Sequence, residues 1–260
     1  MKSLSRSTLI LRALAERPRR PSELSRELGK PWATIYRTVR VLTDEEILRR
    51  DPDTGAYALG PTMWSLASTY GRDHAVLGVG LGYLEQMLPQ VPGLLKVTER
   101  CAGEAVTLFN EQNPQATSVR RIHAQYRLPL HGASFGHVLL AHSDEEFLEE
   151  YLSLPLPRVT PGTITDAEAL RERVAQIREH GYAISRGELQ AGNSSVSAPI
   201  FSRRPGAIAA LSVVVPIEVV EQQERCDELV RLVRTTALLI SESLGWRSYH
   251  PGHPTGSAHA

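Results

Sequence analysis

A serine in a short glycine pattern is the clearest candidate for covalent chemistry in this sequence. Ser134 lies in the segment Gly-Ala-Ser-Phe-Gly at residues 132–136, which fits the G-x-S-x-G pattern of a nucleophilic serine. Such hydrolases need a parallel sheet before the serine, and an acid and a histidine after it. The late histidines here, His250, His253 and His259, lie at the end of the chain. We therefore expect no enzyme and no catalytic residue, with a serine hydrolase as the alternative.

Four histidines are close together in the sequence. They are His123, His131, His137 and His142. Neither cysteine partners nor carboxylates at i, i+4 spacing accompany them, as a zinc site would require. The two cysteines, Cys101 and Cys226, are far apart and suggest neither a metal site nor a disulfide framework. The sequence therefore predicts no metal, no cofactor and a reducing, cytoplasmic compartment.

Recognition of nucleic acid is the chemistry that residues 29–42 favour. Apolar residues at i, i+4 and i+7 form the buried stripe of a predicted helix, and Arg37 and Arg40 fall on its outer face. A guanidinium group matches both base edges and phosphate oxygens. An exposed helix with solvated arginines is the simpler alternative. The candidate DNA-binding residues are Lys30, Ala33, Thr34, Tyr36, Arg37, Arg40, Arg49 and Arg50.

The elements around this helix favour DNA binding. In order, they are predicted helices at residues 4–16, 22–29 and 31–45 and strands at residues 47–50 and 56–59. Ser22 is the expected N-cap of the second helix and Gly29 its end. The order is that of a winged helix-turn-helix domain over residues 1–60, which hold 12 Lys and Arg against 8 Asp and Glu. Because all these features agree, we expect the domain to bind double-stranded DNA.

The rest of the chain predicts a second domain. We expect a linker helix at residues 61–75, an effector domain at residues 76–247 and a disordered tail at residues 248–260. The predicted strands of the effector domain are residues 94–100, 105–111, 117–123, 182–185, 195–201 and 207–216. Ser143 and Thr165 are expected to cap two of its helices. Strands of an antiparallel sheet with helices beside them give an α+β fold class.

Apolar segments and side chains bear on subunit association, on packing and on membrane insertion. The segment at residues 75–84 is apolar on most sides, and it either pairs two subunits or packs inside its own. Trp32 and Trp64 are expected to be packing residues. There is no apolar run of roughly 18 residues that would cross a membrane, and no signal peptide is expected.

Several stretches, in their order along the chain, resemble the isocitrate lyase regulator (IclR) family of bacterial transcription regulators. They are "YALG" at residues 57–60, "LPLHGASFGHVLLA" at residues 128–141, "REHGYAISRGELQAGNSSVSAPIF" at residues 178–201 and "AIAALSVVVP" at residues 207–216. The resemblance covers about residues 4–245. It implies a GAF-like effector-binding domain, a homodimer or dimer of dimers and a palindromic operator. We expect the chain to be a ligand-responsive transcription regulator that acts as a repressor. A winged-helix regulator whose second domain only dimerises is a further alternative.

The resemblance also implies an effector site at the start of a helix. Family members bind small acids through backbone N–H groups, which here belong to Ser134 and Phe135, and helix N-termini attract anions. The matching polar positions are Ser185 or Arg186, Ser195 and Ser212, and Val214 also lies at an effector-site position of the family. Serines replace an acidic and a cysteine position of the family, valine replaces a serine, and Phe135 is bulkier than usual. We therefore expect a carboxylate with an apolar or aromatic body rather than a two-carbon acid.

Overall fold

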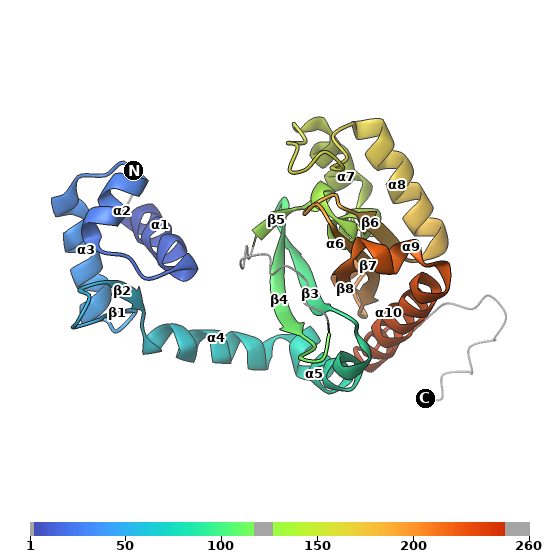
Figure 1. Ribbon diagram of the computed structural model, residues 1–260, viewed down its shortest axis with the longest axis horizontal. Helices are drawn as coiled ribbons and strands as arrows, with labels where there is room; N and C mark the ends of the chain where they lie inside the picture. The colour runs from blue at the N-terminus through green and yellow to red at the C-terminus, as the bar shows by residue number, and fades with distance from the viewer. Residues whose placement is uncertain (1–2, 117–126, 248–260) are drawn as a thin grey trace, which may run out of the picture. The chain divides into compact units, whose positions relative to one another are not determined.

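The computed structural model describes residues 3–116 and 127–247, and the chain divides into two compact units, Met1–His74 and Ala75–Ala260. The first unit contains α1 (Ser3–Glu16), α2 (Pro21–Leu28), α3 (Trp32–Asp44), β1 (Leu48–Arg50), β2 (Tyr57–Leu59) and α4 (Pro61–Asp73) (Figure 1). β1 and β2 form an antiparallel hairpin in which Leu48 pairs with Leu59. The predicted tail and the strand predicted at residues 117–123 fall on residues 248–260 and 117–126, outside the described residues.

The core of the first unit joins α1, α2 and α3 to the hairpin. Ile10, Leu24, Ile35 and Val39 are fully buried there. Gly29 ends α2 in the left-handed conformation, with φ 59°, which glycine adopts without steric cost. Arg20, not Ser22, occupies the N-cap position, so α2 begins two residues earlier than predicted, at Pro21, whose ring presets the helical φ. The three-helix, two-strand order is that of a winged helix.

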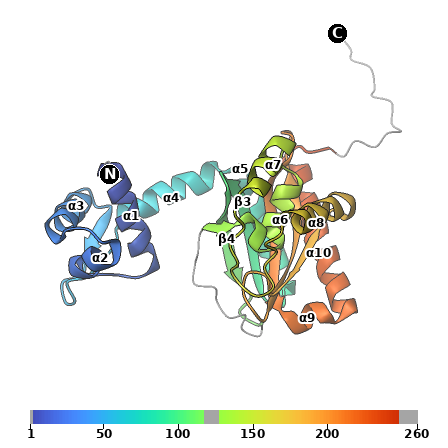
Figure 2. The ribbon, with the colours of Figure 1, turned by 90° about the horizontal axis from the view of Figure 1, so that it is seen from above.

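The second unit is a six-stranded antiparallel sheet covered by helices on both faces (Figures 1 and 2). Its strands are β3 (Leu94–Cys101), β4 (Glu104–Gln112), β5 (Arg127–Pro129), β6 (Ala183–Arg186), β7 (Asn193–Phe201) and β8 (Ala207–Pro216), in the order β5-β4-β3-β8-β7-β6. Its helices are α5 (Ala75–Met87), α6 (Ser134–Ala141), α7 (Glu145–Ser153), α8 (Ala167–His180), α9 (Ile217–Glu221) and α10 (Gln223–Ser243), with short 3-10 turns at Leu88–Gln90 and Leu130–Gly132.

The two faces of this sheet differ in chemistry. One face packs its apolar side chains, such as Leu95 and Val97 of β3, in a core shared with α5 and α10. The other face lies beneath α6, and alternation places Lys96 of β3 and Ser212 of β8 on it. Leu211 belongs to the α10 side and so does not line the same space as Ser212.

Helix caps of the second unit correct two expectations. Asp144, not Ser143, caps α7, and its side chain accepts from the N–H of Phe147. Asp166, not Thr165, caps α8 in the same way. In both cases the sequence offers a hydroxyl and a carboxylate in succession, and the carboxylate adds a favourable charge at the helix N-terminus.

One side of the segment at residues 75–84 packs inside its own subunit. Val76 and Leu84 of α5 are buried in the core shared with α10, and Gly80 lies against Ile240 of α10. α5 leaves Val79 and Leu81 exposed on its other side, and α4 is more exposed still, since none of its residues is buried. Trp64 of α4 is 77% exposed, so the expectation that it packs is wrong within the described chain. No helix among the described residues is long and apolar enough to span a membrane.

Candidate functional site

The outer face of α3 carries basic side chains that the fold leaves free. Ile35, Val39 and Leu42 hold the opposite face in the core. Arg37 and Arg40, one turn apart, are exposed, and neither pairs with a carboxylate in the described part of the chain. Two guanidinium groups therefore project from a rigid helix toward solvent.

The other predicted DNA-binding residues lie around this face. Ala33 is exposed, and Lys30 and Thr34 are half-buried near the start of α3. Tyr36 is exposed and stacks on Trp32, with ring centroids 4.9 Å apart and an interplanar angle of 9°. Arg49 and Arg50 are exposed on β1 in the hairpin.

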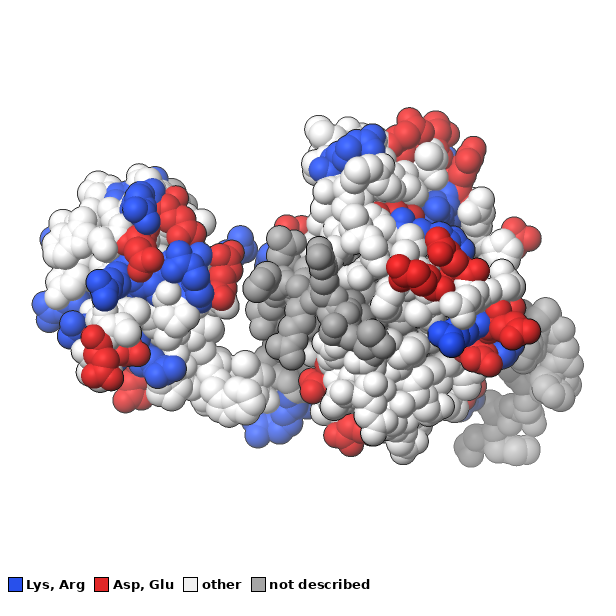
Figure 3. All heavy atoms as spheres, viewed as in Figure 1, with Lys and Arg blue, Asp and Glu red and all other residues white. Residues whose placement is uncertain are grey.

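Arg19 shows what a structural arginine looks like in the same unit. It is 4% exposed and makes ion pairs with Glu16, at 2.7 Å, and Glu27, at 2.9 Å. Figure 3 shows basic and acidic side chains mixed on the visible face of the first unit. α3 and the hairpin contribute exposed arginines that form no ion pair among the described residues, namely Arg37, Arg40, Arg49 and Arg50.

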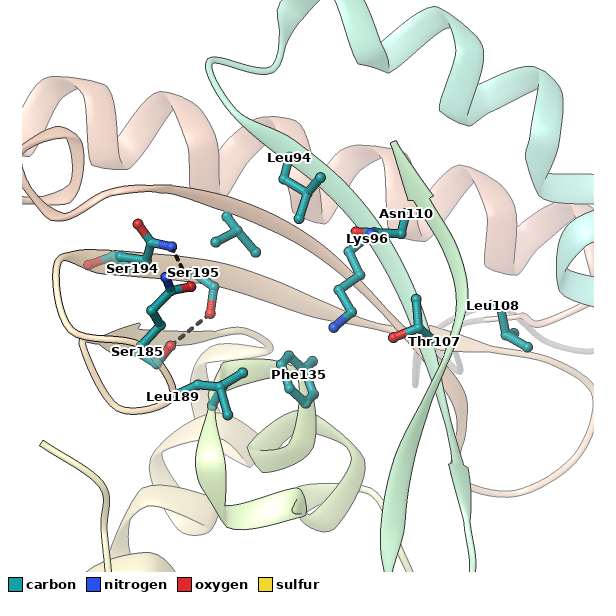
Figure 4. Close-up of a pocket in the computed structure, with 14 residues that line it drawn as sticks. Leu94, Lys96, Thr107, Leu108, Asn110, Phe135, Ser185, Leu189, Ser194 and Ser195 are labelled. Atoms are coloured by element: carbon teal, nitrogen blue, oxygen red, sulfur yellow. Dashed lines mark hydrogen bonds between the residues drawn. The ribbon is translucent and has the colours of Figure 1, made fainter. Parts of the chain in front are cut away.

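A cavity of about 280 Å³ lies between the polar face of the sheet and the start of α6 (Figure 4). Its lining residues are Leu94, Lys96, Thr107, Leu108, Asn110, Ala133, Phe135, Ser185, Leu189, Gln190, Asn193, Ser194, Ser195 and Val214. Four predicted effector residues are therefore brought together on one cavity, namely Phe135, Ser185, Ser195 and Val214. The cavity combines apolar walls with hydroxyl and amide groups.

Buried serines form a continuous hydrogen-bonded chain beneath this cavity. Ser134 lies 2.6 Å from the hydroxyls of both Ser195 and Ser197. Ser185 extends the chain from Ser195, and Ser212 extends it from Ser197, each at 2.7 Å. Buried hydroxyls need partners, and here each supplies one to the next. The chain ties the start of α6 to β6, β7 and β8.

The start of α6 presents unpaired backbone donors. Among the described residues, no oxygen accepts from the N–H of Ser134 or of Phe135, since the first hydrogen bonds of the helix come from Gly136 and His137 to the carbonyl of Ala133. The segment can fold this tightly because Gly136 has no Cβ; a Cβ at this position would overlap the carbonyl oxygen of Leu130. Free N–H groups at a helix N-terminus attract anions.

The charged group of the cavity is Lys96, which sequence reasoning missed. Its side chain is 6% exposed, and its ammonium lies 4.7 Å from the centroid of the Phe135 ring. Burial lowers the pKa of Lys96 to about 8. The available signal was a lysine inside an apolar strand in a chain with only three lysines.

Arg186 does not supply this charge. It is exposed and lies outside the cavity lining, because its neighbour Ser185 takes the inward direction of β6 and successive side chains of a strand alternate. Ser134 and Ser212 are fully buried and reach the site only through the serine chain.

Comparison with known proteins agrees with both units. Residues 3–52 match the model of the IclR helix-turn-helix domain, and residues 82–242 match that of the bacterial transcriptional regulator IclR C-terminal domain. The chain belongs to the IclR family of bacterial transcriptional regulators. It is 28% identical over 233 residues to the HTH-type transcriptional repressor AllR of Escherichia coli K12, covering 88% of this chain and 84% of AllR.

Solved IclR structures share this fold. An IclR homolog of Microbacterium hydrocarbonoxydans, in complex with 4-hydroxybenzoate, is 32% identical with a TM-score of 0.80, covering 94% of this chain and 99% of that one. An IclR regulator of Alicyclobacillus acidocaldarius is 26% identical with a TM-score of 0.84, covering 94% of this chain and 98% of that one.

Membership of a regulator family overturns the hydrolase alternative, and the geometry around Ser134 explains why the pattern misleads. Ser134 is fully buried, and its hydroxyl contacts serines rather than a histidine in the described structure. His137 is also buried, its Nε2 lies 3.0 Å from the carbonyl of His131, and desolvation lowers its pKa to about 3. The pattern's serine and glycine thus serve the packing of α6, and this IclR-family protein is not an enzyme.

The clustered histidines are structural where the chain is described. His131 is buried and its ring lies 2.8 Å from the hydroxyl of Tyr151 and 3.0 Å from the carbonyl of Pro157. Within the described ranges, no three His, Cys, Asp or Glu side chains gather as metal ligands would. His123 lies outside those ranges.

Proposed function

We propose that this chain is an effector-responsive transcriptional repressor acting in the cytoplasm, with α3 as its recognition helix. The observation that carries the proposal is the two-sided character of α3, one side buried and the other carrying Arg37 and Arg40 without partners among the described residues. In a winged helix such a helix enters the major groove, where guanidinium groups bind guanine edges or phosphates. Arg49 and Arg50 of the hairpin would contact the DNA backbone.

An operator selected from a random duplex library tests this assignment. Arg37→Ala should weaken operator binding by roughly 1–3 kcal/mol if the side chain reads a base. Arg12→Ala is the matched control, because Arg12 is also exposed but lies on α1 rather than on α3 or the hairpin. Unchanged operator affinity in the double variant Arg37→Ala/Arg40→Ala would end the assignment.

We propose further that the protein binds a palindromic operator as a homodimer or a dimer of dimers. One winged helix covers a short half-site, too few contacts for a unique genomic address. α4 supplies an apolar surface for a second copy of this chain, since Trp64, Leu66 and Tyr70 are each more than half exposed. Charged side chains are few on the face of α4 that Figure 3 shows. Light scattering at micromolar concentration should give at least a dimer, and a monomer that binds its operator tightly would contradict this.

The effector we propose is a carboxylate with an apolar or aromatic body. The free N–H groups at the start of α6 favour an anionic head, and Phe135, Leu189 and Val214 provide apolar walls. The related homolog from Microbacterium holds 4-hydroxybenzoate. Calorimetric titration of the full chain with 4-hydroxybenzoate and with glyoxylate tests the class. Tight binding of glyoxylate with none of the aromatic acid would reject the apolar cavity.

A further inference from the structure

We propose that Lys96 is the specificity-determining residue of the cavity, which selects an anionic effector over a neutral one of the same shape. The inference rests on the proposed effector function and assigns its charge recognition to one side chain.

The sheet register aims Lys96 at the cavity. Lys96 pairs with Asn110 of β4 on one side and with Ser212 of β8 on the other, so its strand neighbours are neutral. Leu95 and Val97, the residues before and after it, are buried on the opposite face of the sheet. Figure 4 shows the lysine side chain running from β3 toward Phe135 and into the open space.

The ammonium group of Lys96 lacks an anionic partner. No carboxylate of the described chain forms an ion pair with it, and no described oxygen accepts a hydrogen bond from it. The Phe135 ring, 4.7 Å away, covers one side of the charge without supplying an acceptor. A buried ammonium has three donors, so the remaining directions face the cavity and call for an acceptor there.

The lining gives this cation no competitor. Of the described residues that line the cavity, Lys96 alone carries a formal charge, and the other polar groups are hydroxyls and amides. The α6 N-terminus adds a partial positive charge of about one half. The charges that the lining itself presents to the cavity are therefore positive. A carboxylate entering it replaces an uncompensated buried charge by a charge pair, whereas the corresponding amide leaves the lysine unpaired.

The same chain shows why the other cations do not take this role. Arg186 is the nearest in sequence to the predicted site, but it is exposed and outside the cavity. Arg173 reaches the loop behind the cavity, where it lies 3.3 Å from Glu188 and is already paired. Lys96 is the cation that remains for the effector.

The test compares the full chain and its Lys96→Met variant as they bind 4-hydroxybenzoate and 4-hydroxybenzamide in calorimetric titrations. Methionine is unbranched and only one heavy atom shorter than lysine, and it removes the charge. We expect the wild-type protein to prefer the acid by at least about tenfold, as close charge pairs do, and the variant to bind both within about threefold. Lys96→Arg should keep the preference for the acid. Arg186→Met removes a charge of the same sign outside the cavity and should change neither affinity.

The outcomes separate this inference from the proposed function. If the wild-type protein binds the acid and Lys96→Met retains the full preference over the amide, the role of Lys96 is wrong while the effector function stands. If the wild-type protein binds neither compound, the proposed aromatic carboxylate and the role of Lys96 both fall. Should Lys96→Met lose stability, the Lys96→Arg variant decides, because equal binding of acid and amide by that variant would also overturn the inference.

Discussion

Replacing Ser134 by alanine should cost more stability than replacing either serine at the ends of the buried chain, Ser185 or Ser212. The hydroxyl of Ser134 is within 2.6 Å of both Ser195 and Ser197, so its loss removes two hydrogen bonds and splits the chain into two pairs. Ser185 ends the chain and makes one such bond, at 2.7 Å. A buried hydrogen bond contributes about 0.5–1.5 kcal/mol, so Ser134→Ala should lower the free energy of unfolding by about 1–3 kcal/mol and Ser185→Ala by about half of that.

Urea unfolding measures this difference in the second unit if one tryptophan reports on it. Trp246 stacks on Phe201 with centroids 5.2 Å apart, and a Trp32→Phe/Trp64→Phe background leaves it as the remaining fluorophore of the three tryptophans. The control is Ser153→Ala, an exposed position on α7 that should change stability by less than about 0.5 kcal/mol. Equal stability of Ser134→Ala and the control, or a larger loss for Ser185→Ala, would refute the reasoning.

Three further results are expected. Arg49→Ala should weaken binding to all duplexes alike and lower the salt dependence of operator affinity by about one charge, which a filter-binding salt series measures; a change confined to one sequence would contradict a backbone contact. Gly136→Ala should destabilise the second unit by about 1–3 kcal/mol or more in the same urea assay, because the added Cβ meets the carbonyl of Leu130; wild-type stability would argue against this close approach. Burial lowers the pKa of Lys96 to about 8, so affinity for a carboxylate should fall above pH 8, where the ligand-free protein loses the ammonium proton. Between pH 8 and the ordinary lysine pKa of 10.5 the unfolded chain binds more protons than the folded one, so the contribution of Lys96 to stability should rise with pH there. Carboxylate affinity that does not change up to pH 9.5 would contradict the role of the lysine.

Short sequence patterns predicted the first unit well, because the residues that determine its helices and turns are close together in the sequence. The i, i+4, i+7 spacing of Ile35, Val39 and Leu42 identifies the buried side of α3, and the structure buries all three. Gly29 ends α2 where its conformational freedom is needed. The start of α2 was misplaced because Ser22 and Pro21 both mark helix starts, and the choice depends on backbone geometry that neither residue type determines alone.

The cavity was harder to predict because its residues come from distant segments. Ser134, Ser185, Ser195 and Ser212 followed from resemblance, but their joining into one hydrogen-bonded chain depends on the register of β6, β7 and β8. Alternation along β6 points either Ser185 or Arg186 toward the cavity, and the register of β6 against β7 determines which of the two it is. Lys96 was missed for the same reason, since a lysine in a strand is most often solvent-facing and only the pairing of β3 with β8 buries it.

The central claim is that an anion in the cavity and DNA on α3 are linked, and reciprocal binding tests it most directly. Operator affinity is measured with and without saturating 4-hydroxybenzoate, and the affinity for 4-hydroxybenzoate is measured with and without saturating operator. Linkage requires the two ratios to be equal, and we expect operator affinity to fall by about 5–150-fold when the acid is bound. Operator affinity that stays the same while the acid occupies the cavity would contradict the account.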